Sequence, residues 1–147
     1  MNTMAGPAVP INTVSGDEPI PGATFVLVVE DHDHTRDMYS HYLRHVGMRV
    51  ETAITGEEAI VKARGLLPDV IVMDMSLPSS IEGDDAAREI KGDPDTRHIP
   101  IVAVTAYAFT GRQRALASGC DAYCRKPFLP RDLALIVASL AKRDLPA

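Results

Sequence analysis

Residues 25–31 read Phe-Val-Leu-Val-Val-Glu-Asp, five apolar residues in a row that run directly into two acids. An unbroken apolar run of this length is typical of a β-strand that is buried on both faces, as the strands of parallel sheets are. Shorter runs of the same kind occupy 70–73, 101–104 and 122–124, and residues 48–53 are a weaker candidate. These segments predict five short strands.

Segments with helical periodicity follow the strand candidates. The last is the clearest, because apolar residues recur at 133, 136, 137 and 140 and Pro130 suits a first helical turn. Four more helices are expected at 34–46, 57–64, 84–91 and 111–118. Strands that alternate with helices predict an α/β domain whose parallel sheet is covered on both faces. The flavodoxin-like, doubly wound (βα)5 arrangement with strand order 2-1-3-4-5 fits the count.

The size and charge of the chain exclude several classes of protein. Its 147 residues are the usual size of one domain. A net charge of -5 argues against a surface that binds the phosphate backbone of nucleic acids. The chain has no apolar stretch near the roughly 18 residues that span a membrane, and no Lys or Arg before Arg36, as a basic signal-peptide start would need. We therefore expect a cytoplasmic protein that binds neither nucleic acid nor membranes.

Three regions are expected along the chain. Residues 1–22 are rich in Pro and Gly and show no sustained periodicity, which predicts a flexible N-terminal tail. Residues 23–142 hold all the predicted strands and helices and form the domain. Residues 143–147 are expected to be a short C-terminal tail.

Acidic side chains follow two of the predicted strands. Glu30 and Asp31 follow the first strand and Asp74 follows the third, and the order 2-1-3-4-5 makes these two strands neighbours. Carboxylates this close together repel each other unless a cation lies among them, and a set of oxygen ligands suits Mg²⁺. A carboxylate such as Asp74 can also act as a nucleophile toward phosphorus and form an aspartyl phosphate.

Two further polar residues occupy the ends of the other strands. Thr105 ends the fourth strand with a hydroxyl group that can bond a phosphoryl oxygen, and Lys126 follows the fifth with a mobile ammonium group that suits phosphate. Each of these residues alone is better explained as a turn, a cap or a solvated charge. Their common position at one end of four different strands is what predicts a phosphoryl-transfer site.

Four segments resemble the receiver domain of two-component response regulators: VVED at 28–31, VMDMSLP at 72–78, VTA at 104–106 and DAYCRKPF at 121–128. The resemblance covers roughly residues 24–141. A start at Met1 and the lack of room for another domain resemble the stand-alone, CheY-like type of regulator.

The resemblance implies roles for the acidic residues. Asp74 would be the phospho-acceptor, and Glu30 and Asp31 would be the acidic pair around Mg²⁺. Asp31 and Asp74 would bind the metal directly, and Ser76 would add its backbone carbonyl. No other cofactor is implied.

The resemblance also implies a switch and its partners. Thr105 and Lys126 would contact the phosphoryl group, and Tyr123 would be the aromatic switch residue. A histidine kinase or histidine phosphotransferase would supply the phosphoryl group, and a downstream protein would read the face made by helix four, strand five and helix five. The chain would then be no conventional enzyme, since it catalyses only its own phosphorylation and dephosphorylation. A weak homodimer is left open.

Two departures from the family pattern concern the neighbourhood of the site. The loop after Pro78 is one residue longer than usual before Gly83, which affects contacts beside the acceptor and the lifetime of the phosphoryl group. Arg125 places a second positive charge beside Lys126. His32 follows the acidic pair and could lie near the metal and tune the local charge, but it is expected to be a bystander.

Three alternatives remain open. A pseudo-receiver would keep the fold as a static interaction module without accepting phosphate. A phosphohydrolase of the haloacid dehalogenase type would need a second Asp two residues after Asp74, where this chain has Ser76. A receiver excised from a hybrid kinase would carry the same internal motifs.

Overall fold

The structure is a computed structural model that describes residues 23–77, 80–107 and 109–143. The tail predicted at 1–22 lies outside the described residues, as do residues 144–147 of the predicted C-terminal tail. Arg143 ends the last helix, so the helix extends one residue beyond the predicted domain boundary. Within the described part of the chain, no helix is long and apolar enough to cross a membrane.

Five parallel strands form one sheet in the order β2-β1-β3-β4-β5, so the predicted fold is confirmed. The strands are β1 (Phe25–Val29), β2 (Arg49–Ala53), β3 (Val70–Asp74), β4 (Ile101–Thr105) and β5 (Ala122–Arg125). Burial explains the pattern of the sequence. Every residue of β3 and β4 is buried, whereas the edge strand β2 keeps polar residues and is only partly buried, which made it the weakest prediction.

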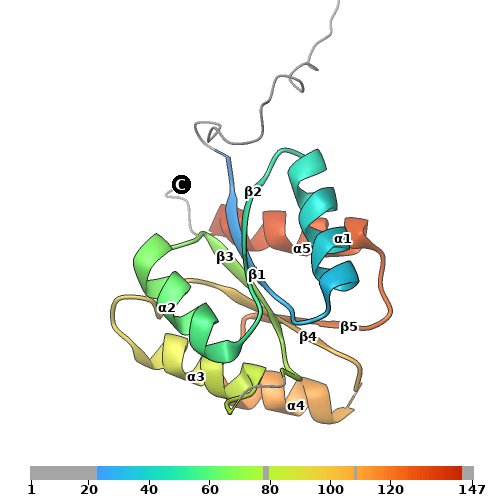
Figure 1. Ribbon diagram of the computed structural model, residues 1–147. Coiled ribbons are helices and arrows are strands. Elements are labelled where there is room, and N and C mark those ends of the chain that lie inside the picture. Colours follow the sequence, from blue (N-terminus) through green and yellow to red (C-terminus); the bar gives the residue numbers. More distant parts are fainter. Residues whose placement is uncertain (1–22, 78–79, 108, 144–147) are drawn as a thin grey trace, which may run out of the picture.

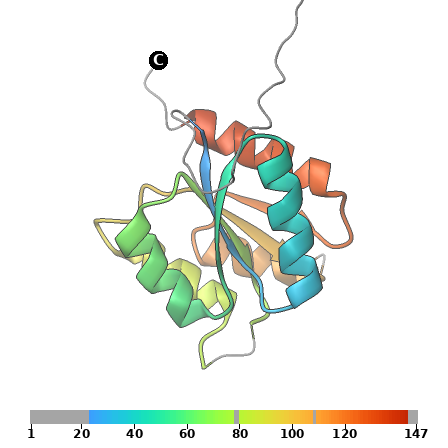
Figure 2. The same cartoon turned by 45° about the horizontal axis from the view of Figure 1, so that its top comes forward.

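Helices cover both faces of the sheet. They are α1 (Asp33–His45), α2 (Gly56–Leu66), α3 (Gly83–Gly92), α4 (Phe109–Ala117) and α5 (Pro130–Arg143). Helices α1 and α5 lie together on one face, and α2, α3 and α4 lie on the other (Figure 1). The turned view in Figure 2 shows the same division. The predicted helix bounds are correct to within one or two residues, except that α5 was given no fixed end.

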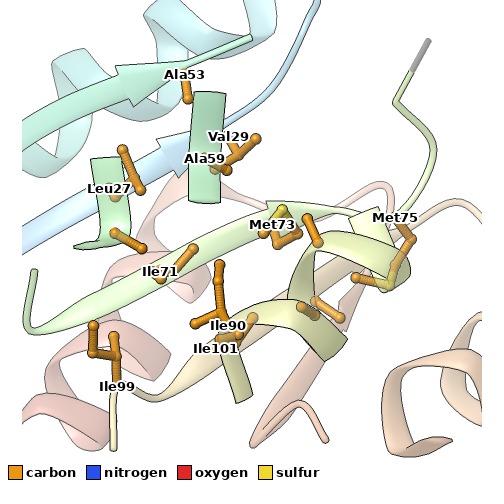
Figure 3. Packing of buried hydrophobic residues seen from close by; sticks show 14 of the residues in the cluster. Leu27, Val29, Ala53, Ala59, Ile71, Met73, Met75, Ile90, Ile99 and Ile101 are labelled. Carbon is orange, nitrogen blue, oxygen red and sulfur yellow. The ribbon is translucent and has the colours of Figure 1, made fainter. Parts of the chain in front are cut away.

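Two apolar layers hold these helices against the sheet. The layer under α2, α3 and α4 contains Leu27, Ile71, Met73 and Ile101 from the strands and Ile90 from α3 (Figure 3). The layer under α1 and α5 uses the alternate strand residues, as expected where successive side chains point to opposite faces. The sheet is therefore fixed from both sides, and the loops at the carboxyl ends of its strands are free to carry chemistry.

Candidate functional site

The register of the two central strands brings the predicted acidic residues together. Val29 of β1 pairs with Met73 of β3, so the residues that follow them, Glu30 and Asp74, emerge side by side at the same edge of the sheet. Both side chains are almost fully buried, with exposed fractions of 1% for Glu30 and 6% for Asp74. Two buried carboxylates in contact are unfavourable without a positive group.

Lys126 supplies part of that positive charge. Its Nζ lies 3.6 Å from Glu30 Oε1 and 3.7 Å from Asp74 Oδ2. The backbone N–H of Lys126 donates to the carbonyl of Thr105 at 2.7 Å, which ties the loop after β5 to the end of β4. The bond from Lys126 to Pro127 is cis. One ammonium group thus faces both carboxylates.

The two carboxylates differ in their pKa values. Burial raises the pKa of Asp74 to about 6, helped by the negative charge of Glu30 and opposed by the Ser76 N–H and by Lys126. Burial also acts to raise the pKa of Glu30, but the His32 N–H, Lys126 and the His32 ring outweigh it and hold that pKa below its usual value. Of the two carboxyl groups, Glu30 is therefore the stronger acid, and burial disfavours the ionised form of Asp74 relative to a solvated aspartate.

The donor set suits a divalent cation. Glu30 Oε1 and Asp31 Oδ1 are buried and have no hydrogen-bond partner among the residues that the structure describes. Glu30, Asp31 and His32 each present one ligand atom, and these three atoms lie within 4.8 Å of one another. Buried, unpartnered carboxylate oxygens are the ligands that Mg²⁺ prefers.

His32 is the member of this cluster that the sequence analysis set aside. Its Nδ1 lies 3.2 Å from Glu30 Oε2 and 3.6 Å from Asp31 Oδ1. The turn into α1, with His32 at the N-cap, folds the ring back toward the acids. The consecutive Glu-Asp-His triplet was the signal in the sequence, but spacing alone does not say which way the third side chain points.

The backbone after β3 lies against the Asp74 carboxylate. The Ser76 N–H donates to Asp74 Oδ1 at 2.9 Å, and the Gly83 N–H donates to the Met75 carbonyl at 3.3 Å. The structure thus brings the backbone of Ser76 to the Asp74 carboxylate, while a role for the Ser76 carbonyl remains a prediction. Residues 78 and 79 of the longer loop lie outside the described residues.

Replacing Gly83 with Ala is expected to destabilise the protein by about 1–3 kcal/mol. The new Cβ would lie 2.7 Å from the carbonyl carbon of Asp74 and 2.8 Å from Met75 Cα, so the backbone of Asp74 and Met75 would have to shift. Gly92 ends the same helix in open space, so Gly92→Ala is the matched control and is expected to keep or raise stability. Urea unfolding measures both, and equal stabilities for the two variants would contradict this packing.

Arg114 of α4 anchors the same loop. Its guanidinium donates to both carboxylate oxygens of Asp84, at 2.7 and 3.0 Å, and to the carbonyl of Met75 at 3.2 Å. It also pairs with Glu82 at 3.0 Å. The hydrogen bonds from Arg114 hold the pKa of Asp84 below its usual value. Helix α4 is therefore joined directly to the segment that follows Asp74.

The two predicted switch residues lie on separate strands. Thr105 is buried at the end of β4, and its hydroxyl accepts a hydrogen bond from the Tyr107 N–H at 3.1 Å. A Cβ on Gly111 would overlap the Thr105 side chain, so α4 packs closely on it. Tyr123 of β5 is half-buried and packs against the core under α2, α3 and α4. The structure brings Thr105 to the strand-end edge, whereas Tyr123 pairs with Ala103 and lies two residues back from that edge.

An open groove of about 860 Å³ lies elsewhere, between α2 and α3. Its lining includes Ile60, Ile81 and the ion pairs Arg64–Asp93 and Arg88–Asp85. None of the strand-end carboxylates lines it. The candidate site is therefore the carboxylate cluster at the strand ends and not this groove.

Comparison with known proteins gives consistent matches. The family model of the response regulator receiver domain matches residues 26–138. The polar-differentiation response regulator DivK of Brucella ovis is 35% identical over 117 residues, which are 78% of this chain and 94% of DivK.

Two solved structures illustrate the likeness in three dimensions. The chemotaxis response regulator CheY4 of Vibrio cholerae gives a TM-score of 0.75 at 30% identity and covers 80% of this chain and 98% of its own. The receiver domain of a sensor histidine kinase from Pseudomonas aeruginosa gives a TM-score of 0.76 at 33% identity, covering 82% of this chain and 98% of its own. That structure has a magnesium ion coordinated in its active site cleft.

Proposed function

Because this chain belongs to the response regulator receiver domain family, we propose that it is a phosphorylation-controlled switch of phosphorelay signalling in which Asp74 accepts the phosphoryl group. The observation that carries this proposal is the setting of the Asp74 carboxylate. It is buried beside Glu30, faces Lys126 Nζ at 3.7 Å, and adjoins carboxylate oxygens that lack hydrogen-bond partners. This is the arrangement that a nucleophile toward phosphorus needs.

Different residues of the chain would bind the metal, attack phosphorus and offset charge during phosphoryl transfer. Asp31, Asp74 and the Ser76 carbonyl would hold Mg²⁺ with Glu30 beside them, and the bound cation would neutralise charge on the phosphoryl group. A carboxylate oxygen of Asp74 forms the new bond to phosphorus while the bond from phosphorus to the donor's histidine nitrogen breaks, and that imidazole leaves with the electron pair. Lys126 offsets the added negative charge.

Receiver domains interact with histidine kinases or phosphotransfer proteins. We propose that a protein of one of these kinds donates the phosphoryl group to this chain. The matched relatives include both a separate response regulator and the receiver domain of a kinase. The proposed reaction takes place at the Asp74 carboxylate of this chain in either setting. The chain therefore acts on its own Asp74 and on no released substrate.

The switch would work through the buried hydroxyl of Thr105. A phosphoryl dianion on Asp74 competes for this hydroxyl, which in the present structure is bonded to the Tyr107 backbone. Moving Thr105 disturbs the close packing of Gly111 on it and so shifts α4, and Tyr123 follows. Phe109, 71% exposed, and Leu116, 65% exposed, give α4 an apolar surface for a downstream protein at the α4–β5–α5 face.

Intact mass spectrometry after incubation with Mg²⁺ and acetyl phosphate tests the proposal. The wild-type chain is expected to gain the mass of one phosphoryl group, and the gain should be labile to base and absent without Mg²⁺. Asp74→Asn should gain nothing, because an amide oxygen is too weak a nucleophile. Asp37→Asn, an exposed acid on α1, is the matched control and should behave as wild type. No adduct under any condition, with a donor kinase included, would favour the static pseudo-receiver instead.

A further inference from the structure

We propose that His32 is a ligand of the metal site, so that the cation is held by carboxylate oxygens together with one imidazole nitrogen. This inference rests on the proposed cation site but not on phosphoryl transfer to Asp74. It concerns a residue of this chain that follows the acidic pair. The consequence would be a site that prefers transition-metal cations more strongly than an all-oxygen site does.

The first argument is the spacing of the donor atoms. His32 Nδ1 lies 3.2 Å from Glu30 Oε2 and 3.6 Å from Asp31 Oδ1. Neighbouring ligands of an octahedral cation with bonds of about 2.1 Å lie about 3 Å apart. The imidazole nitrogen and the carboxylates are thus close to the separation that one shared cation would impose.

The second argument is that hydrogen bonds fix the backbone turn that carries the ring beside the acids. The His32 N–H donates to Glu30 Oε2 at 3.2 Å. Arg36 Nη1 donates to the carbonyls of Glu30 at 3.1 Å and Asp31 at 3.3 Å, so the turn that carries His32 is fixed from α1. The His32 side chain is 72% exposed, so packing does not force its Nδ1 toward the acids.

The third argument comes from the carboxylate oxygens that a hydrogen bond from the imidazole would leave without a partner. A hydrogen bond from His32 to Glu30 Oε2 would account for that one oxygen. It would leave Glu30 Oε1 and Asp31 Oδ1 buried without hydrogen-bond partners among the described residues. A cation held by Asp31 and His32, with Glu30 beside it, would place a positive charge next to both of these buried oxygens.

Ligand chemistry then predicts the selectivity of the site. Mg²⁺ favours oxygen ligands and keeps much of its water, whereas imidazole nitrogen binds Mn²⁺ and the later divalent transition metals more readily. Removing the imidazole should therefore weaken Mn²⁺ binding far more than Mg²⁺ binding. A hydrogen-bonding role of His32 would instead change the affinity for both cations alike.

The test is titration calorimetry with Mg²⁺ and with Mn²⁺ on the full chain at pH 8, for wild type, His32→Ala and the control His34→Ala, whose side chain is exposed on α1. We expect His32→Ala to lose about tenfold or more in Mn²⁺ affinity, with Mg²⁺ affinity changed much less. His34→Ala should match wild type. Pulsed electron paramagnetic resonance of bound Mn²⁺ should show coupling to an imidazole ¹⁴N in wild type and none in His32→Ala.

Several outcomes would overturn the assignment. Mn²⁺ bound to wild type without ¹⁴N coupling, or equal losses for both cations in His32→Ala, would remove His32 as a ligand. No binding of either cation would remove the site itself. The assignment and the proposed function can fail separately, because nitrogen coupling is measured without phosphorylation. Coupling without an adduct from either acetyl phosphate or a donor kinase would keep His32 and reject the switch, and an adduct without coupling would do the reverse.

Discussion

Asp74→Asn is expected to stabilise the protein against unfolding at neutral pH when divalent cations are absent. Burial and the adjacent Glu30 charge raise the pKa of Asp74 from 3.8 to about 6, so the ionised carboxylate is unfavourable in the folded state. At about 1.4 kcal/mol per pKa unit, the penalty above pH 6 is on the order of 3 kcal/mol at most. An amide removes this penalty and still accepts the hydrogen bond from the Ser76 N–H.

The stability difference between Asp74→Asn and wild type is expected to depend on pH, because the pKa of Asp74 is raised in the folded state. A carboxyl whose folded-state pKa is raised contributes its full stability below the unfolded value of 3.8, and that contribution is lost as pH rises through about 6. The gap between variant and wild type should therefore be small near pH 4, widen up to about pH 6 and then level off. Urea unfolding in EDTA at several pH values measures it. A variant that is less stable than wild type at pH 7.5 would contradict the electrostatic account of the site.

Asp31→Asn is expected to lower the affinity for Mg²⁺ by at least about tenfold. Asp31 is partly buried, its Oδ1 has no hydrogen-bond partner among the described residues, and a hard cation gains more from a carboxylate than from a neutral amide. Asp33→Asn is the matched control, because its carboxylate is 81% exposed and pairs with Arg36. Titration calorimetry compares the two variants. Similar affinities would show that Asp31 does not hold the metal.

The fold could be predicted because its central strands have no polar face. Residues 26–29, 70–73 and 101–104 are buried, and strands that are buried on both faces are continuous apolar runs. The edge strand β2 is half exposed, so its pattern was weaker. The sequence pattern did not indicate that α4 begins at Phe109, because Thr110 and Gly111 are poor helix formers.

The acidic part of the site could be predicted because the sheet itself determines it. Once β1 and β3 are neighbours, Glu30 and Asp74 must meet at the same edge. The anchoring role of Arg114 could not be predicted. Its partners Asp84 and Met75 lie 30 and 39 positions away in the sequence, and no periodic pattern in the loop indicates these contacts. The position of the His32 ring could not be predicted either, because it depends on a single turn at the start of α1.

Reductive trapping of the phosphorylated residue tests the central claim most directly. Sodium borohydride reduces an aspartyl phosphate to homoserine with release of phosphate, so the acceptor is marked by a change of residue that peptide sequencing by mass spectrometry detects. After treatment with Mg²⁺ and acetyl phosphate, homoserine is expected at position 74 and at no other aspartate. Homoserine at a different aspartate, or its absence from a chain that has gained a phosphoryl group, would contradict the assignment of Asp74 as the acceptor.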